Sequence, residues 1–250
     1  MDDAFVKRDS TAPPDFFAAE ARGLRWLAEV RDGVAVVGVR RVGRDHIVLD
    51  RLAASTPDLE HADDLGRRLA RTHAAGAPAW GADQDGYIGP LRLPNGPFDS
   101  CADLWWRGRV EPYLVAAVDA GRLGRSDAAA VEAAVARGLG DIPAQEPSRI
   151  HGDLWAGNVV WTEHGAVLVD AGAAHGGHRE ADLAMLALFG LPHLDRVLRA
   201  YDDAWPLAEG WQLRVPFWQL HPLLVHVVLF GGGYAARTRQ AAAKIRSTGR

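Results

Sequence analysis

The segment from His151 to Asp170 constrains this chain more than any other part of its sequence. An aspartate stands two positions after His151, at Asp153, and Asn158 follows five positions later. Two short apolar runs, 159–161 and 166–169, then lead to a second aspartate, Asp170, twelve positions after Asn158. The chain has only one other asparagine, Asn95, which makes the placement of Asn158 informative. The spacing predicts a polar loop followed by short strands that bring two carboxylates and one amide together.

Phosphoryl transfer of the kinase type uses this set of groups, because one side chain orients the attacking hydroxyl and two others hold metal on the phosphates. We predict Asp153 as the general base that accepts the hydroxyl proton. Asn158 and Asp170 are predicted to bind Mg²⁺, which prefers oxygen ligands and takes one or two from protein. In the alternative interpretation, residues 151–153 form a turn and Asp170 is an ordinary carboxylate at a strand end.

Lysine is rare in this chain: of 28 basic residues only Lys7 and Lys244 are lysines. Lys7 follows an apolar run that reads as a strand, and a helical pattern begins after Pro13-Pro14 and carries Glu20. We predict that Lys7 binds the ATP phosphates as a compact point charge and that Glu20 pairs with it. A solvated surface lysine and an exposed helix carboxylate are the alternatives.

The distribution of strand and helix patterns predicts an α+β fold with two lobes, of the protein-kinase-like type. Residues 1–54 predict a small β-rich N-terminal lobe that binds nucleotide, and residues 55–250 predict a larger helical lobe with the catalytic loop and the substrate site. Backbone groups at Asp50 and Leu52 are expected to meet the adenine at the hinge. The local patterns further predict strands at 34–39 and 46–52, a loop at 76–97, and a helix at 99–122 kinked at Pro112.

Several residues near the loop are predicted to support it. Asp182 begins an apolar helix, and we expect it to hydrogen-bond the backbone of the catalytic loop, with His151 as a second structural residue. Trp155 lies inside the loop, where its face could pack on a sugar-like substrate. No histidine pair has metalloprotease spacing, so the remaining histidines are expected in loops, on the surface or in the core; the loop and surface set is His164, His175, His178 and His193.

Composition excludes several other classes of protein. The net charge of −4 and the absence of a basic block disfavour a nucleic-acid partner. The single Cys101 gives neither an internal disulfide nor a zinc pattern. No signal peptide is recognised, and no stretch of about 20 apolar residues suggests a membrane span. We expect a cytoplasmic monomer that acts on a small molecule.

The chain resembles the fructosamine kinase (ketosamine-3-kinase) family, which is related to the aminoglycoside phosphotransferases. The resemblance implies ATP- and Mg²⁺-dependent phosphorylation of a sugar hydroxyl on a ketosamine, the rearranged product of a sugar and an amine. The motifs that carry it span nearly the whole chain: 5–7 (FVK), 17–24 (FAAEARGL), 69–73 (LARTH), 87–89 (YIG), 95–96 (NG), 151–158 (HGDLWAGN), 177–185 (GHREADLAM) and 229–234 (LFGGGY).

Two departures from the family pattern leave alternatives open. Ala171 stands where the family places a proline after the second magnesium aspartate. Only six residues precede Lys7, so we expect an incomplete N-terminal lobe without a glycine-rich hairpin over the phosphates. An aminoglycoside or other amino-sugar phosphotransferase is one alternative function, and a nucleotide-binding pseudokinase-like protein is another.

Overall fold

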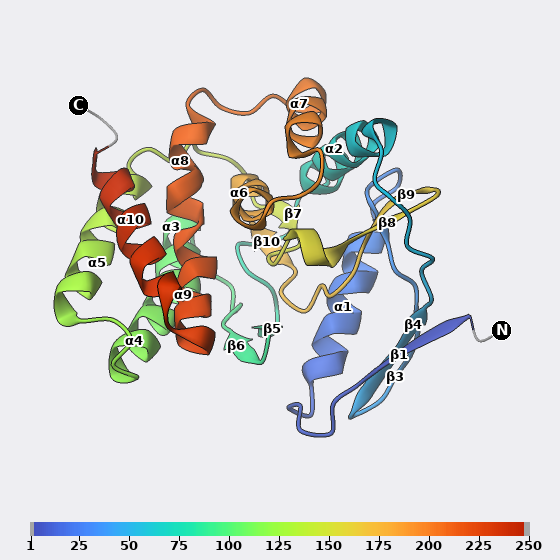
Figure 1. The fold of residues 1–250 in the computed structure, drawn as a ribbon, viewed down its shortest axis with the longest axis horizontal. Helices are drawn as coiled ribbons and strands as arrows, with labels where there is room; N and C mark the ends of the chain where they lie inside the picture. The colour runs from blue at the N-terminus through green and yellow to red at the C-terminus, as the bar shows by residue number, and fades with distance from the viewer. Residues whose placement is uncertain (1–2, 248–250) are drawn as a thin grey trace.

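The computed structural model describes residues 3–247 and has two lobes, with the N-terminus on the small lobe and the C-terminus on the far side of the large one (Figure 1). In the small lobe, helix α1 (Phe16–Ala28) packs against an antiparallel sheet with the strand order β1-β4-β3. The strands are β1 (Ala4–Arg8), β3 (Val39–Val42) and β4 (His46–Asp50). Helix α1 forms because its apolar residues recur at helical spacing and are buried on one side, among them Phe17, Leu24 and Leu27.

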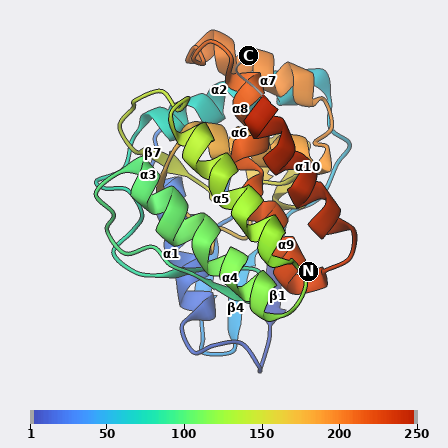
Figure 2. The ribbon, with the colours of Figure 1, turned by 90° about the vertical axis from the view of Figure 1, so that its left-hand side faces the viewer.

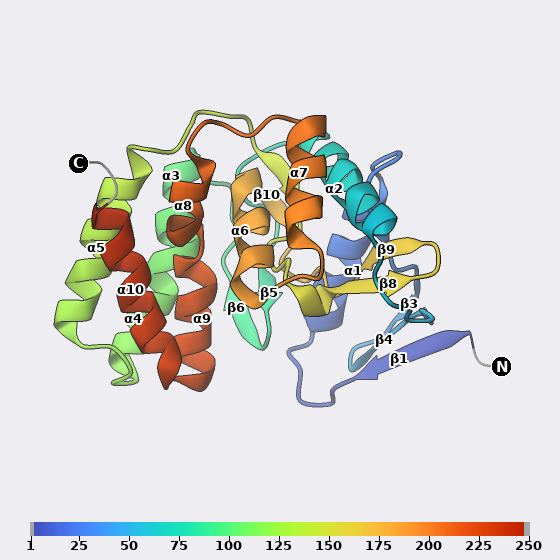
Figure 3. The same cartoon turned by 45° about the horizontal axis from the view of Figure 1, so that its top comes forward.

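The large lobe is mostly helical, with its helices in two groups around short strands (Figure 1). One group holds α2 (Leu59–Ala74), α6 (Arg179–Phe189) and α7 (Leu194–Ala204). The other holds α3 (Cys101–Asp103), α4 (Glu111–Asp119), α5 (Arg125–Leu139), α8 (Trp211–Trp218), α9 (Leu220–Phe230) and α10 (Gly233–Ser247). Figure 2 shows α4 and α5 in front in this second group, and Figure 3 shows α7 lying beside α2.

Short strands connect the two helical groups. The pairs are β5 (Gly86–Ile88) with β6 (Leu91–Leu93), β7 (Ser148–Ile150) with β10 (His175–Gly177), and β8 (Val159–Thr162) with β9 (Gly165–Leu168). Among the described residues, the buried apolar side chains form three clusters: one in the small lobe, one around β8–β9 with α2, α6 and α7, and one among the remaining helices. The hairpin that carries the candidate site therefore rests on a core of its own.

Two local expectations from the sequence are wrong, and a third is confirmed with a difference in detail. The strand expected at 34–39 is divided: β2 (Ala35–Val36) pairs in parallel with β9, whereas β3 pairs with β4. The loop expected at 76–97 contains the β5–β6 hairpin. The helix expected at 99–122 is present from Cys101 to Asp119, but it is irregular just before Pro112. There the segment η1 (Leu104–Val110) is π-helical, and the N–H of Glu111 donates to the carbonyl oxygen of Trp106.

The expectation about membrane spans also needs correction. The segment Trp211–Phe230, which covers α8 and α9, has the length and mean hydropathy (1.3) of a membrane-crossing helix. In this fold 56% of that stretch is buried inside the protein, where its apolar side chains belong to the helical core. Core helices of soluble proteins meet the same criteria of length and composition, so hydropathy alone does not assign this segment to a membrane.

Candidate active site

The β8–β9 hairpin brings the predicted metal ligands together. Asn158 immediately precedes β8, and Asp170 follows β9 by two residues. Because the two strands are antiparallel, with Val159 opposite Leu168, the start of β8 and the end of β9 lie at the same end of the hairpin. The N–H of Val169 donates to the carbonyl oxygen of Asn158 at 3.1 Å and fixes the two segments to each other.

Asp153 is held beside this pair by the loop that precedes β8. The Nδ2 of Asn158 donates to the backbone oxygen of Asp153 at 2.8 Å and lies 3.4 Å from its Oδ2. Burial raises the pKa of Asp153 to about 6, and the hydrogen bond from Asn158 opposes that rise only in part. Gly152 has φ +80°, and a Cβ there would lie 2.2 Å from the carbonyl oxygen of Ala173. The tight turn therefore needs glycine before the aspartate.

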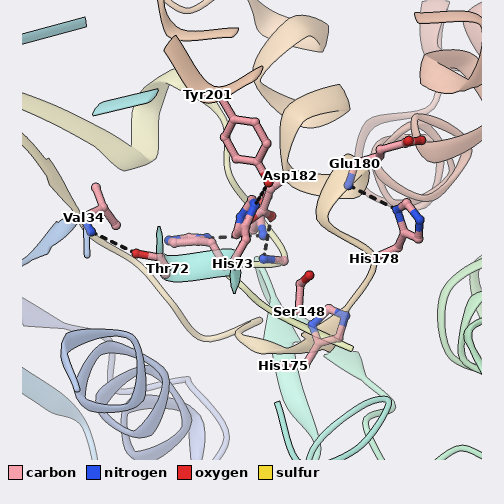
Figure 4. A network of polar contacts seen from close by, with 12 residues as sticks. Val34, Thr72, His73, Ser148, His175, His178, Glu180, Asp182 and Tyr201 are labelled. Carbon is pink, nitrogen blue, oxygen red and sulfur yellow. Dashed lines mark hydrogen bonds and ion pairs between the residues drawn. The ribbon is translucent and has the colours of Figure 1, made fainter. Parts of the chain in front are cut away.

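Asp182, at the first turn of α6, holds the loop that contains Asp153 in place through hydrogen bonds. Its carboxylate accepts hydrogen bonds from the N–H of His151 (2.8 Å) and of Gly152 (2.9 Å), as expected from the sequence. Figure 4 shows Asp182 close to His73 and Tyr201, and the ring nitrogens of His73 lie 3.2 Å from its Oδ2 and 2.9 Å from the Tyr201 hydroxyl. Although burial acts in the opposite direction, the hydrogen bond from His73 helps to lower the pKa of Asp182.

His73 and Tyr201 are parts of this hydrogen-bond network that the sequence did not reveal. His73 occupies an apolar position of α2, where it reads as one more buried residue of that helix. Tyr201 lies 128 positions later on α7, and only the packing of α2 against α7 brings the two side chains together. His151 contributes a further contact, because its Nε2 lies 2.8 Å from the carbonyl oxygen of Val169.

The side chain of Lys7, on β1, forms ion pairs with both Glu20 and Asp170. Its Nζ lies 3.0 Å from the Oε2 of Glu20 and also pairs with Oδ1 of Asp170. Burial of Lys7 acts to lower its pKa, but the two carboxylates outweigh burial and raise it. Burial raises the pKa of Glu20, whereas the ammonium of Lys7 outweighs burial at Asp170 and lowers its pKa. The predicted lysine–glutamate pair is thus formed, and the second carboxylate completes a three-way ion cluster.

These groups open onto one cavity of about 210 Å³ between the lobes. Phe16 and Tyr87 contribute aromatic rings to its wall, and Trp155 lines it with 39% of its surface exposed. The ring of Trp155 covers Gly157, where a Cβ would lie 2.3 Å from the indole. The residues predicted from the sequence that line this cavity are Lys7, Glu20, Asp153, Trp155, Asn158 and Asp170.

Two other predicted residues lie elsewhere. Asp50 ends β4 and Leu52 follows it, and neither lines this cavity. The Oδ1 of Asp50 accepts a hydrogen bond from the Nε of Arg40 at 2.5 Å, and its N–H donates to the carbonyl oxygen of Gly38. Contacts of their backbone with an adenine remain a prediction.

The expectation that His175 and His178 lie in loops or on the surface is wrong. His175 and His178 are buried rather than placed in surface loops. The Nδ1 of His175 donates to the carbonyl oxygen of Ala173 at 2.7 Å, and the ring of His178 stacks on Trp218 at 4.6 Å between centroids. Within residues 3–247, no group of three or more His, Cys, Asp or Glu side chains is arranged to hold a metal ion.

The sequence profile of the fructosamine kinase family matches residues 1–248. The chain belongs to the fructosamine kinase family. A probable ketoamine kinase of Thermus thermophilus is 37% identical over 230 residues, which cover 92% of this chain and 82% of that protein. A probable ketoamine kinase of Enterococcus faecium is 31% identical, and the match covers 85% of that protein. This family member is therefore a phosphotransferase that uses an alcohol group as acceptor.

Solved structures support the same assignment of the fold. A candidate fructosamine-3-kinase from Thermobifida fusca is 45% identical, with a TM-score of 0.93 over 97% of this chain and 85% of the other. An aminoglycoside phosphotransferase solved in complex with gentamicin has a TM-score of 0.64 at 13% identity, over 98% of this chain and 85% of the other. At that identity the second likeness shows only the shared fold, with a small β-rich lobe and a larger helical lobe.

Proposed function

We propose that this fructosamine kinase family member transfers a phosphoryl group from ATP to a sugar hydroxyl of a ketosamine, with Asp153 as the general base. The observation that carries the proposal is the convergence of Lys7, Asp153, Asn158 and Asp170 on one cavity. These groups come from both lobes and from widely separated positions in the sequence. Catalysis of phosphoryl transfer is mostly positioning and charge stabilisation, and this arrangement supplies both.

Asp153 suits the role of base because of its surroundings. Burial gives its carboxylate a pKa of about 6, so that it is ionised at neutral pH yet more basic than an exposed aspartate. A base with a pKa near the working pH is most effective at accepting a proton in the transition state. Asn158 holds the backbone and the carboxylate of Asp153 in place, so the base keeps one orientation toward the cavity.

The residues at the hairpin end fit a magnesium ion. Because the Nδ2 of Asn158 donates to Asp153, its amide oxygen is left as an acceptor, and the Asp170 carboxylate stands beside it on the same cavity. One carboxylate and one amide oxygen suit Mg²⁺, which takes its other ligands from phosphates and water. When bound, the ion would neutralise negative charge on the phosphates. Asn158 and Asp170 would hold it, and Lys7 would bind the phosphates while Glu20 keeps its ammonium in position.

Replacing Asp170 with alanine should abolish the Mg²⁺ dependence of nucleotide binding. The carboxylate is the only ionised group in the proposed pair of ligands, so its loss removes most of the attraction for the cation. Titration of Mg²⁺ against binding of a non-hydrolysable ATP analogue measures this effect. Asp203→Ala, at an exposed aspartate on α7, is the matched control. An unchanged Mg²⁺ dependence in Asp170→Ala would remove Asp170 from the metal site.

The acceptor class can be tested directly. The names of the related proteins point to ketoamines, and Trp155 offers an exposed aromatic face beside Asp153 on which a sugar ring could pack. We expect phosphate transfer from ATP to fructosyl or ribulosyl amines, with kcat/KM at least about tenfold above that for aminoglycosides. The assay compares both panels at equal Mg²⁺. Preference for aminoglycosides would establish the alternative phosphotransferase, and ATP binding without transfer to any acceptor would support a pseudokinase-like protein.

A further inference from the structure

A second cavity, of about 390 Å³, lies behind α1 and is larger than the cavity at Asp153. Arg22, Arg25 and Trp26 of α1 line it, and at 100° per residue these positions lie away from Glu20, which faces Lys7. Gly172 forms part of the wall of both cavities. The two spaces are therefore neighbours on opposite sides of the chain that follows the catalytic hairpin.

An unused hydrogen-bond donor faces this second cavity. Asn95 lines it and is only 1% exposed, and its Oδ1 accepts a hydrogen bond from Nη2 of Arg109 at 2.5 Å. Its Nδ2 has no hydrogen-bond partner among residues 3–247. A Cβ placed on Gly86, which also lines the cavity, would lie 3.1 Å from this Nδ2. Among the described residues, the fully buried side-chain atoms that lack a partner do not include this Nδ2, so it is open to the cavity. An acceptor placed in the cavity could therefore bond to it without displacing another protein group.

Arg109 makes this donor stronger. It is 2% exposed, and its Nη1 donates to the carbonyl oxygens of Pro94 (2.6 Å) and Gly108 (2.9 Å). Burial lowers the pKa of Arg109 to about 10, which still leaves the guanidinium charged at neutral pH. No carboxylate in the described part of the chain hydrogen-bonds it. Its charge polarises the Asn95 amide and gives the base of the cavity a positive potential.

The rim adds two further positive charges from α1. The Nη2 of Arg22 donates to the carbonyl oxygen of Asp85 at 3.2 Å, a neutral acceptor that leaves the charge uncompensated. Arg25 is exposed and has no ion-pair partner within the described residues. Both guanidinium groups are therefore available to an anion that enters the cavity.

Two of the acidic residues around the rim have ion-pair partners. Glu29 pairs with Arg149 at 3.1 Å, and Asp85 pairs at 3.3 Å with Arg92, which also pairs with Asp15 at 3.0 Å. Asp83 is exposed and is the acidic lining residue without such a pair in residues 3–247. The balance of uncompensated charge at the cavity is thus positive.

We propose that the cavity behind α1 binds a small organic carboxylate, with its anionic group on Asn95 and the arginines and its apolar body against Trp26. A volume of about 390 Å³ falls in the range of ligand-binding sites in proteins. Part of the remaining wall consists of small apolar side chains, which leave room for a flat apolar group; they are Ala19, Ala79, Ala82 and Ala174.

Occupancy of this cavity should change nucleotide binding at the active site. Helix α1 lies directly on the chain after Asp170, since a Cβ on Gly23 would come within 1.8 Å of the carbonyl oxygen of Ala171. A ligand that displaces α1 therefore moves Glu20 and Asp170 together, and with them both partners of Lys7. Coupling of this kind is reciprocal, so ATP analogue and carboxylate must alter each other's affinity by the same factor.

The test compares indole-3-acetate with indole-3-acetamide, which differ mainly in charge, by calorimetry and by ligand-observed NMR on the full chain. We expect the acid to bind with a Kd of about 1 mM or tighter and the amide at least about tenfold more weakly. Asn95→Asp keeps the acceptor for Arg109 but replaces the donor with a negative group, and should weaken binding of the acid at least about tenfold. Arg25→Glu should act in the same direction, while Arg199→Glu, at an exposed arginine on α7, is the charge-matched control.

The measurements separate this proposal from the proposed function, because carboxylate binding needs no turnover. No binding of the acid at about 10 mM, or equal binding of acid and amide, would overturn the anion site. Equal weakening by Arg25→Glu and Arg199→Glu would do the same, and this comparison remains available if Asn95→Asp does not fold. Binding of the acid with an unchanged affinity for the ATP analogue would overturn the coupling.

Discussion

Asp153→Asn should lower kcat by about 10²–10⁴ while the Kd for an ATP analogue changes less than about threefold. The amide has nearly the shape of the carboxylate but cannot accept the proton of the attacking hydroxyl. The variant should fold normally, because it replaces a buried carboxylate whose pKa is raised to about 6 with a neutral group. Steady-state kinetics with a ketosamine and equilibrium nucleotide binding measure the two effects. A variant with the kcat of the unmodified protein would show that Asp153 is not the base.

The pH dependence of the unmodified protein provides a second measurement on the same group. The raised pKa of Asp153 means that its carboxylate becomes protonated as the pH falls through about 6. Because only the ionised form accepts a proton, kcat/KM should fall about tenfold per pH unit below that value. The residual activity of Asp153→Asn should not show this fall in kcat/KM at low pH. If kcat/KM instead falls only near pH 4, the carboxylate is hydrated rather than buried when the enzyme works.

Asp182→Ala should destabilise the fold by about 3–5 kcal/mol and lower kcat even where the variant is folded. The substitution leaves the N–H groups of His151 and Gly152 buried without an acceptor and removes one of the two side-chain partners of His73. For a chain of this length the loss corresponds to a fall in Tm of roughly 6–20 °C. Thermal unfolding and kcat measured well below the lowered Tm separate stability from positioning of Asp153. Asp203→Ala should change neither quantity.

The stabilising effect of Asp182 should also depend on pH in a defined direction. Its pKa is lowered in the folded protein, so the group contributes stability above its ordinary value of 3.8 and loses that contribution as the pH falls through the lower folded value. The difference in unfolding free energy between the unmodified protein and Asp182→Ala should therefore shrink on acidification below pH 3.8. A difference that is constant with pH would indicate a packing defect instead of a lost ionic anchor.

The sequence by itself determined the family, the two-lobed fold class and the residues that meet at the cavity. Asp153, Asn158 and Asp170 could be found because they lie in one continuous segment, in which a short hairpin brings Asn158 and Asp170 to the same end and the preceding loop holds Asp153. Lys7 and Glu20 could be found because the scarcity of lysine and the helical pattern after Pro14 single them out. Patterns within a few turns or strands are set by local backbone geometry, which the sequence records directly.

Contacts between distant segments were decided only by the tertiary structure. The hydrogen bonds that link Asp182, His73 and Tyr201 depend on the packing of α2 against α7. Similarly, β2 pairs with β9 of the large lobe rather than with the strands of the small lobe. His175 and His178 are likewise buried because helices pack over them. The polarity of a histidine side chain does not predict this burial. The cavity behind α1 arises where a helix, a loop and the segment after Asp170 meet, and its free donor on Asn95 exists only because Arg109 occupies the other side of that amide. Burial and hydrogen-bond partners depend on which distant segments pack against each other, so they cannot be read from any single stretch of sequence.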